Sequence, residues 1–326
     1  MIVRTSLTGP FPRSEALVAA TRDLDRGRTT PEAVEQLFAS TEEEVVQLEE
    51  RLELDVLSGG YLRWADLFRP FAQTWRGFTV GPVTRWFETN TFYRQPILHA
   101  PPERIPGAIA PSLPEAARRR GTKRSKVILP GPLTFATLLD NRSGETSESL
   151  THRLGRLLAE EVRELRGLGY ETFQFQEPEV VVRPPHGPKA EATVAAYRAI
   201  GEALEGSTSM VWTFFGDASP ALPLLARLPV GGVGIDLSET DPSGVRGFPE
   251  RRALGLGCID PRTTLVEDPG EVAQIARELS ARIRPSAVVL GPGGPLDLLP
   301  FESAARKLHL LPAARQALTV GNGGTR

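Results

Sequence analysis

The chain has 326 residues, of which 40% are apolar, and it carries a formal net charge of −2. This length and composition suit one large globular domain, and the near-neutral charge argues against nucleic acid or an anionic membrane as a partner. Cys258 is the single cysteine, so no disulfide can form within the chain. Without an apolar run of membrane-spanning length or a secretory signal pattern in the first residues, a soluble cytoplasmic protein is expected.

Eight short apolar runs suit buried parallel strands. In chain order they are Ile2–Leu7, Leu54–Leu57, Val127–Leu129, Thr172–Phe175, Ser209–Phe215, Gly232–Ile235, Ala253–Ile259 and Ala287–Leu290. Helical patterns separate most of them, at Pro31–Leu52, Glu148–Leu168, Ala190–Leu204, Ala221–Leu228, Glu271–Ile283 and Phe301–Leu318. This alternation predicts an α/β fold, a (β/α)8 TIM barrel. No glycine-rich dinucleotide fingerprint follows the first run, which argues against a Rossmann sheet.

One segment, residues 77–125, breaks the alternation between the second and third strands. We expect a hairpin-like insertion over the barrel mouth, followed by a helix near Pro114–Arg120, because long connections in compact domains are usually functional. Residues 140–146 are predicted to form a mobile loop, and the glycine-rich tail at about 320–326 is predicted to be flexible. Residues 1–326 are therefore interpreted as one barrel domain that carries an insertion.

Each predicted strand ends in a short signature. The signatures are Thr8-Gly-Pro-Phe-Pro-Arg13, Ser58-Gly-Gly-Tyr-Leu-Arg63, Pro130-Gly-Pro-Leu-Thr134, Gln174-Phe-Gln-Glu-Pro178, Trp212-Thr-Phe-Phe-Gly-Asp217, Gly234-Ile-Asp236, Gly257-Cys-Ile-Asp260 and Gly291-Pro-Gly-Gly-Pro295. In a TIM barrel the ends of all eight strands meet at one face, where active sites are built. The signatures therefore predict a reaction site at the C-terminal mouth of the barrel.

The order and spacing of these signatures resemble the cobalamin-independent methionine synthase family. They look most like its single-barrel, C-terminal-domain-like members, which lack the duplicated N-terminal barrel. The most specific parts are Thr8–Arg13, Arg85–Asn90 followed by Arg94–Pro96, Gln174–Pro178, and Gly255–Asp260 leading to Glu267. The resemblance covers nearly the whole chain and implies a TIM barrel of the methionine synthase and uroporphyrinogen decarboxylase type.

The zinc ligands that the resemblance implies are absent. Family members bind the homocysteine sulfur to a barrel zinc, which deprotonates the thiol so that it takes the methyl group of 5-methyltetrahydrofolate. By motif position the histidine, first cysteine, glutamate and late cysteine fall on Trp212, Phe214, Asp236 and Gly294. One carboxylate is not a zinc site, and neither Cys258 nor the four histidines offer ligand spacing. We therefore expect no metal.

The amino-acid pocket of the family is altered as well. The resemblance implies a serine, a glutamate and a further acidic residue where this chain has Pro10, Tyr61 and Gln176, so partners for an amino group are missing. Arg262 stands where a catalytic histidine is expected, and Leu138 lies near the place of a folate-stacking tryptophan. The acceptor is therefore expected to be something other than homocysteine.

Three residues are candidates for catalysis. Glu177, at the end of the fourth strand, suits an acid, a base or a ligand for a pterin edge, or else a structural ion pair with a barrel arginine. Asp236 suits substrate or cation binding, or else the capping of a turn. Arg262 together with Asp260 suits the binding of an anionic substrate, because arginine grips carboxylates in bidentate fashion, or else a simple ion pair.

Seven more residues are candidates for substrate binding besides Asp260. Trp212 and Phe214 are expected at the mouth, where they would stack on a flat substrate, cover a cation or plug the site. The others lie in the first, second and fourth signatures or close to them, and each could equally be scaffold. They are Arg13, Tyr61, Arg63, Asp66 and Gln176.

The sequence thus predicts a zinc-independent methyltransferase. It is expected to use 5-methyltetrahydrofolate and a small-molecule acceptor of a specialised biosynthetic pathway. Two alternatives stay open. One is a metal-free lyase or decarboxylase in which Arg13, Arg63 and Arg262 hold the substrate, and the other is a non-catalytic barrel that binds a folate or a partner protein.

Overall fold

A parallel β-sheet forms the centre of the computed structural model, which describes residues 1–320. Its seven strands lie in the order β1 (Val3–Thr5), β10 (Val288–Pro292), β9 (Ala253–Ile259), β8 (Gly232–Asp236), β7 (Thr208–Trp212), β6 (Thr172–Gln176) and β4 (Lys126–Pro130). Apart from Val320, the predicted flexible tail lies outside the described residues.

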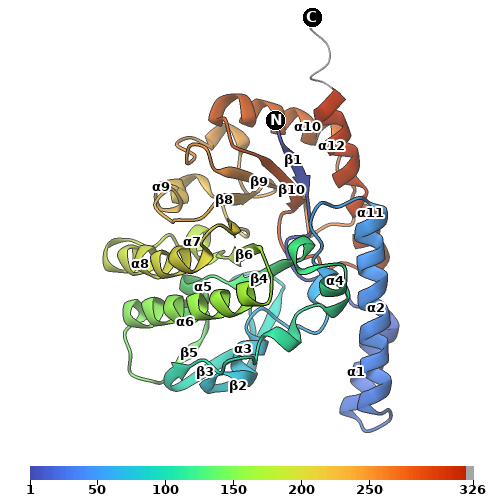
Figure 1. Cartoon of the computed structure of the whole chain (residues 1–326), viewed down its shortest axis with the longest axis vertical. Coiled ribbons are helices and arrows are strands. Elements are labelled where there is room, and N and C mark those ends of the chain that lie inside the picture. Colours follow the sequence, from blue (N-terminus) through green and yellow to red (C-terminus); the bar gives the residue numbers. More distant parts are fainter. Residues whose placement is uncertain (321–326) are drawn as a thin grey trace, which may run out of the picture.

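The remaining strand of the barrel is reduced to two residues. Val56 bridges to Ser6 beside β1, and Leu57 bridges to Ser125 beside β4, both in parallel. The chain turns away at once because Gly59 and Gly60 have φ values of 65° and 74°, a conformation that favours glycine. These bridges join the two edges of the sheet, so the predicted (β/α)8 barrel is confirmed (Figure 1).

Tyr61 reinforces this short strand with its side chain. The Tyr61 hydroxyl donates to the carbonyl oxygen of Lys126 at 2.9 Å and accepts from the amide of Ile128 at 2.7 Å. The phenol is 1% exposed, so both hydrogen bonds are protected from water. The Tyr61 side chain thus makes hydrogen bonds to β4 that the backbone of the short second strand does not make.

Helices surround the barrel, with α2 on one flank and α6 and α8 on the other (Figure 1). The long ones are α1 (Glu15–Asp25), α2 (Pro31–Arg51), α6 (Ser147–Gly167), α8 (Gly187–Leu204), α10 (Pro269–Ile283), α11 (Phe301–Leu308) and α12 (Leu310–Val320). The short helices are α3 (Arg69–Thr74), α4 (Glu115–Arg119), α5 (Pro132–Leu138), α7 (Glu179–Val182) and α9 (Leu222–Leu225). None of the helices within residues 1–320 combines the length and apolar character needed to cross a bilayer.

The helices differ from the prediction in three places. The pattern predicted at Phe301–Leu318 is interrupted at His309, which separates α11 from α12. Only Leu222–Leu225 of the predicted 221–228 helix is α-helical. Helix α1 was not predicted, because Leu17 is its only fully buried residue and so its apolar stripe is narrow.

The insertion is an antiparallel hairpin. Its strands are β2 (Arg76–Arg85) and β3 (Phe92–Glu103), and β5 (Asp140–Asn141) adds to β3 in parallel. The first two residues of the predicted mobile loop are thus a strand. Trp86 and Tyr93 of the hairpin pack on Phe68, with ring centroids 5.3 and 5.5 Å apart, so the hairpin is anchored to the barrel.

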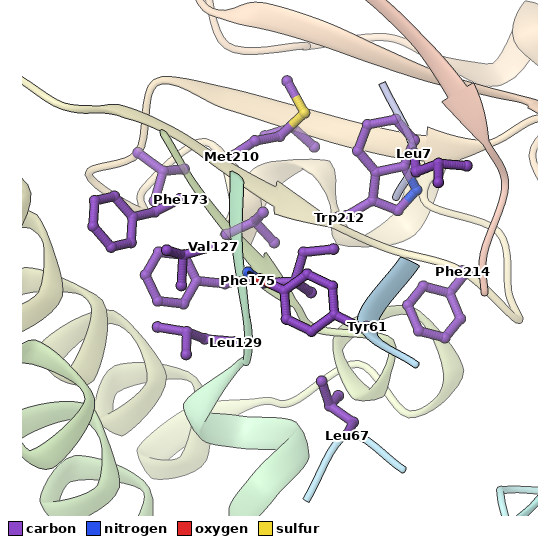
Figure 2. Close-up of a cluster of buried hydrophobic side chains, with 14 of the residues drawn as sticks. Leu7, Tyr61, Leu67, Val127, Leu129, Phe173, Phe175, Met210, Trp212 and Phe214 are labelled. Carbon is purple, nitrogen blue, oxygen red and sulfur yellow. Dashed lines mark hydrogen bonds between the residues drawn. The ribbon is translucent and has the colours of Figure 1, made fainter. Parts of the chain in front are cut away.

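Trp212 fills the interior of the barrel. Its ring lies against Gly234 and Gly255, where an added Cβ would approach ring atoms to 2.3 and 2.5 Å. The indole Nε1 donates to the carbonyl oxygen of Gly293 at 3.0 Å. Figure 2 draws Trp212 and Phe214 within this cluster of buried side chains. The glycines of β8 and β9 therefore make room for one large aromatic residue.

Candidate active site at the barrel mouth

Two adjoining cavities lie at the C-terminal ends of the barrel strands. The mouth cavity, of about 60 Å³, lies beneath the hairpin. The side cavity, of about 1000 Å³, lies between α1, α2 and the start of α11. Pro10, Ala65 and Asp297 line both of them. The mouth cavity is further lined by Asp66, Leu67, Trp86, Thr91, Phe92, Gln176, Phe215, Pro261, Arg262, Pro295 and Leu298.

Arg262 is held in the mouth cavity by acidic groups of two loops. Its guanidinium Nε donates to Asp260 Oδ1 at 2.9 Å, and a second nitrogen donates to Glu239. The pKa of Arg262 is raised by these contacts, with the hydrogen bond to Asp260 as the main cause. Glu267 holds the loop from behind, because its Oε1 accepts both the Asp260 amide and the Lys307 ammonium at 2.8 Å. A fixed cation thus faces the mouth.

Two other residues predicted to bind substrate, Asp66 and Gln176, line the mouth cavity. Most of their polar side-chain atoms already form hydrogen bonds within the protein. Asp66 accepts from the amides of Phe68 and Arg69 at 3.0 and 2.8 Å, and also from the Arg69 guanidinium and the Arg94 amide. Asp66 therefore binds the first amides of α3 and, through the Arg94 amide, also holds strand β3 of the hairpin. The Gln176 amide nitrogen donates to the carbonyl oxygen of Thr8 at 2.7 Å, which leaves its oxygen as the side of the group available to a ligand.

Arg13 and Asp297 bring opposite charges to the side cavity. Arg13 Nε donates to the carbonyl oxygen of Leu62 at 2.8 Å, and no carboxylate of residues 1–320 forms an ion pair with its guanidinium. Burial lowers the pKa of Arg13. Asp297 is exposed to solvent and lines both cavities. Asp297 was missed because its only sequence signal is its place just after the Gly291–Pro295 signature.

Tyr61 and Arg63 contribute less to the cavities than expected. The Tyr61 ring lines the side cavity, but its hydroxyl is committed to β4. Arg63 lies outside both cavities. Its guanidinium pairs with Glu42 and Glu35 and lies 5.5 Å from the ring centroid of Phe38. These contacts favour the scaffold alternative for Arg63, in which it holds α2, and its contact with substrate stays a prediction.

Glu177 is enclosed rather than poised at the mouth. Its carboxylate accepts from the amides of Thr134 and Leu133 at 2.6 and 3.3 Å and from the Tyr197 hydroxyl at 3.0 Å. The two amides belong to the first turn of α5, so the charge lies at the positive end of that helix. Burial raises the pKa of Glu177 to about 7. Glu177 lines neither cavity and its partner is a helix terminus rather than an arginine, so its catalytic role stays a prediction.

Trp212 and Phe214 are both 0% exposed and line neither cavity. A stacking role at the mouth therefore stays a prediction, and their burial favours the alternative of a plugged site. Phe214 packs against Phe215, with centroids 4.8 Å apart, and only Phe215 reaches the mouth cavity. The aromatic character at this mouth thus comes from Phe215 and from the hairpin.

The residues at the family's zinc position do not fit the metal. Asp236 is 2% exposed, and its Oδ1 accepts from the Ser238 amide at 3.0 Å and the Ser238 hydroxyl at 2.5 Å. Burial raises the pKa of Asp236. The Cys258 thiol lies 3.6 Å from the carbonyl oxygen of Gly291, and burial raises its pKa to about 12. Within residues 1–320, no three His, Cys, Asp or Glu side chains are grouped so as to hold a metal ion.

Comparison with known proteins identifies the family. Residues 72–284 match the sequence model described as the N-terminal domain of cobalamin-independent synthase. The chain belongs to the cobalamin-independent methionine synthase family. The matched model describes the N-terminal domain of these synthases rather than the C-terminal barrel with which the motifs were compared. Members of this family are methyltransferases, and the relatives below carry that activity in their names.

Two archaeal methionine synthases match this family member over nearly their whole length. The one from Sulfurisphaera tokodaii is 27% identical over 311 residues, which cover 94% of this chain and 90% of the relative. The one from Sulfolobus acidocaldarius is 26% identical, with 94% and 89% covered. The 5-methyltetrahydropteroyltriglutamate–homocysteine methyltransferase of Bacillus cytotoxicus is 25% identical, and the match covers 80% of this chain but only 35% of that longer protein.

Solved structures of methionine synthases share the fold. The B12-independent methionine synthase from Shewanella sp. W3-18-1 superposes with a TM-score of 0.78 at 17% identity, covering 99% of both chains. A putative vitamin-B12-independent methionine synthase from Listeria monocytogenes gives 0.75 at 16% identity, covering 98% of this chain and 99% of that one. At these identities the likeness supports the barrel architecture.

Proposed function

We propose that this chain transfers a methyl group from 5-methyltetrahydrofolate, without zinc, to a small molecule other than homocysteine. The observation that carries the proposal is the state of the barrel centre. Trp212 and Phe214 fill the space where the family's metal ligands would stand, while the two cavities at the mouth are still present. The names of the relatives support methyl transfer as the reaction class.

The sizes of the two cavities suggest which of them binds the methyl donor and which binds the acceptor. Ligand pockets for molecules the size of a cofactor measure roughly 300–1000 Å³, so a folate fits the side cavity of about 1000 Å³ but not the mouth cavity of about 60 Å³. The bound folate would supply the methyl group on its N5 atom. Arg13 would hold a folate carboxylate, because arginine pairs well with carboxylates.

The acceptor is proposed to meet the donor near Asp297, which lines both cavities. This exposed carboxylate is proposed to take a proton from the acceptor. Arg262 would bind an anionic group of the acceptor from the mouth side. Asp66 and Gln176 would shape the cavity, and Asp260 would orient Arg262.

Two measurements on the purified protein test the proposal. Metal analysis is expected to find zinc well below one ion per chain, and calorimetry is expected to show saturable binding of 5-methyltetrahydrofolate. One zinc ion per chain would overturn the zinc-independent mechanism. Absence of folate binding would remove the proposed donor and leave a lyase or decarboxylase as the enzyme to test next.

A non-catalytic folate-binding barrel is the second candidate. It is favoured by the commitment of Glu177 to α5 and of Trp212 to the barrel interior, which leaves neither for chemistry. Donor labelled on its methyl group separates the two functions. Binding of the donor without loss of the label to any component of a metabolite extract from the source organism would favour the non-catalytic barrel.

A further inference from the structure

A further cavity lies at the opposite, N-terminal end of the barrel, and most of its lining surface is apolar, with Val56, Phe173, Met210 and Val289 among its residues. It measures about 50 Å³ and lies among the first residues of β1, β4, β6 and β7. Its polar lining consists of Arg4, Thr5, Ser6, Lys126, Gln174 and the threonines at 172 and 208, and includes no carboxylate. This cavity is remote from the mouth and plays no part in the proposed methyl transfer.

Lys126 is the buried cation beside this cavity. It is 6% exposed, and its ammonium donates to Ser6 Oγ at 3.0 Å, to Gln174 Oε1 at 2.8 Å and to the carbonyl oxygen of Leu7. All three acceptors are neutral. No carboxylate of residues 1–320 lies within ion-pair distance of the ammonium. The hydrogen bonds are therefore satisfied, but the charge is not balanced locally.

The nearest carboxylate is already engaged elsewhere. Glu49 accepts from the amide and hydroxyl of Ser58 at 2.9 Å and from the amide of Gly59 at 3.0 Å. It acts on Lys126 only at longer range. Burial lowers the pKa of Lys126 to about 7, and the charge of Glu49 opposes this without restoring the ordinary value. Because an unpaired buried charge is costly, a counter-ion close to Lys126 would stabilise the fold.

We propose that the N-terminal cavity binds a small inorganic anion of chloride size, which serves as the counter-ion of Lys126. Ser6 Oγ already accepts from Lys126, so its own proton is available to the anion. The hydroxyls of Thr172 and Thr208 and the exposed guanidinium of Arg4 supply further donors at the rim, whereas the Thr5 hydroxyl donates to Asp55. With water taking about 30 Å³ in the liquid, a cavity of about 50 Å³ holds one such anion but no organic phosphate.

Thermal unfolding of the full chain tests this proposal. Chloride is exchanged for gluconate, which is too large for the cavity, at constant ionic strength and pH. The unfolding midpoint is expected to rise with the logarithm of the chloride concentration above the dissociation constant, since a ligand of the folded state adds RT ln(1 + [L]/Kd) to its stability. Equal midpoints in the two salts, as expected for a cavity that holds only water, would overturn the proposal.

Matched variants locate the effect. Arg4→Gln removes a donor from the rim, and Arg246→Gln removes another exposed arginine that does not line the cavity. The dissociation constant, read from the chloride concentration at which the midpoint begins to rise, is expected to increase several-fold in Arg4→Gln and to stay at the wild-type value in Arg246→Gln. Equal changes in both variants would show a general effect of surface charge and would count against the site.

Crystals grown in bromide provide a test that does not depend on stability. An anomalous scattering peak is expected in the cavity beside Ser6 and Lys126. Its absence at high bromide concentration, with peaks only on the outer surface, would overturn the proposal. Ser6→Ala removes one proposed donor and is expected to weaken the peak. This variant leaves the buried Lys126 in place, so it tests the site without removing the charge that the fold encloses.

Discussion

Some residues of the strand-end signatures contribute to packing in this protein, at positions where the family resemblance implies catalytic or metal-binding residues. By the motif comparison Trp212 is predicted at the position of a zinc-binding histidine, and its indole is hydrogen-bonded to Gly293 and packed on Gly234 and Gly255. A large ring enters a barrel centre only where facing residues have no side chain. The glycines and the tryptophan therefore form one packing unit.

Removal of the Trp212 ring is expected to destabilise the protein strongly. Trp212→Ala leaves a large cavity among glycines that cannot fill it, so the free energy of unfolding should fall by about 3–5 kcal/mol. Trp212→Phe keeps a ring and loses the hydrogen bond, so a fall of only about 1–2 kcal/mol is expected. Chemical denaturation measures both values, and equal effects of the two variants would contradict this account.

Arg13 is expected to contribute to the binding of 5-methyltetrahydrofolate. Its guanidinium faces the side cavity without a carboxylate partner among the described residues, so it is free to pair with an anionic ligand. Arg13→Gln should weaken binding at least about tenfold, because a hydrogen bond to a charged group contributes about 1.5–3 kcal/mol. Calorimetry measures the dissociation constant.

Arg63→Gln is the matched control for that experiment. Arg63 also lies close to Phe38, but it is paired with Glu42 and Glu35 and lines neither cavity. Its substitution should leave the affinity for the folate within about twofold of the wild type. If Arg63→Gln weakened binding as much as Arg13→Gln, the side cavity would not be the folate site.

At the level of elements, close packing between helices α6 and α8 sets their separation on the side of the barrel opposite α2. Helices α6 and α8 cross at Gly155, where an added Cβ would lie 2.4 Å from the Cβ of Ala196. Real Cβ atoms do not approach so closely, and the obstacle includes the backbone of α8. The glycine is therefore needed for contact between helices rather than for backbone conformation.

Two glycine substitutions in α6 should act in opposite directions. Gly155→Ala is expected to lower the free energy of unfolding by about 1–3 kcal/mol, because it forces α6 and α8 apart. Gly167→Ala, at the end of the same helix, meets nothing within 4 Å and should raise it by up to about 1 kcal/mol through helix propensity. Thermal and denaturant unfolding measure both, and destabilisation by Gly167→Ala would contradict the comparison.

At the scale of the whole molecule, the barrel encloses acids that prefer to be protonated. Burial raises the pKa of both Glu49 and Glu177 to about 7 from an ordinary value of 4.5. Between these values the folded protein holds protons that the unfolded chain releases. The stability that these groups contribute is therefore complete below about pH 4.5 and is lost as the pH rises towards 7.

The free energy of unfolding is thus expected to fall as the pH rises from 5 to 7. Glu177 alone should account for about 2 kcal/mol of the fall. Glu177→Gln keeps an oxygen for the Thr134 amide but cannot titrate, so its dependence on pH should be flatter by that amount. Urea denaturation across this range measures the slope. The exposed Glu160→Gln is the control, and a slope as flat as that of Glu177→Gln would contradict the assignment.

The sequence by itself determined the barrel and its family, and it predicted a reaction site at the barrel mouth. Short apolar runs that alternate with amphipathic helices are local patterns, and the signatures that follow them keep their order along the chain. The loss of the zinc ligands could also be read from the sequence, because a tryptophan, a phenylalanine and a glycine cannot bind zinc wherever they point.

Only the tertiary structure decided what each residue of the signatures does. Glu177 caps α5, Arg63 pairs with α2, and Trp212 fills the barrel, because their partners lie 20 to 81 residues away in the chain. Asp297 is recognised as a candidate only from the tertiary structure, because there it lines both cavities. Burial and partnership depend on contacts between distant segments, and these contacts separate a structural carboxylate from one that is free to act.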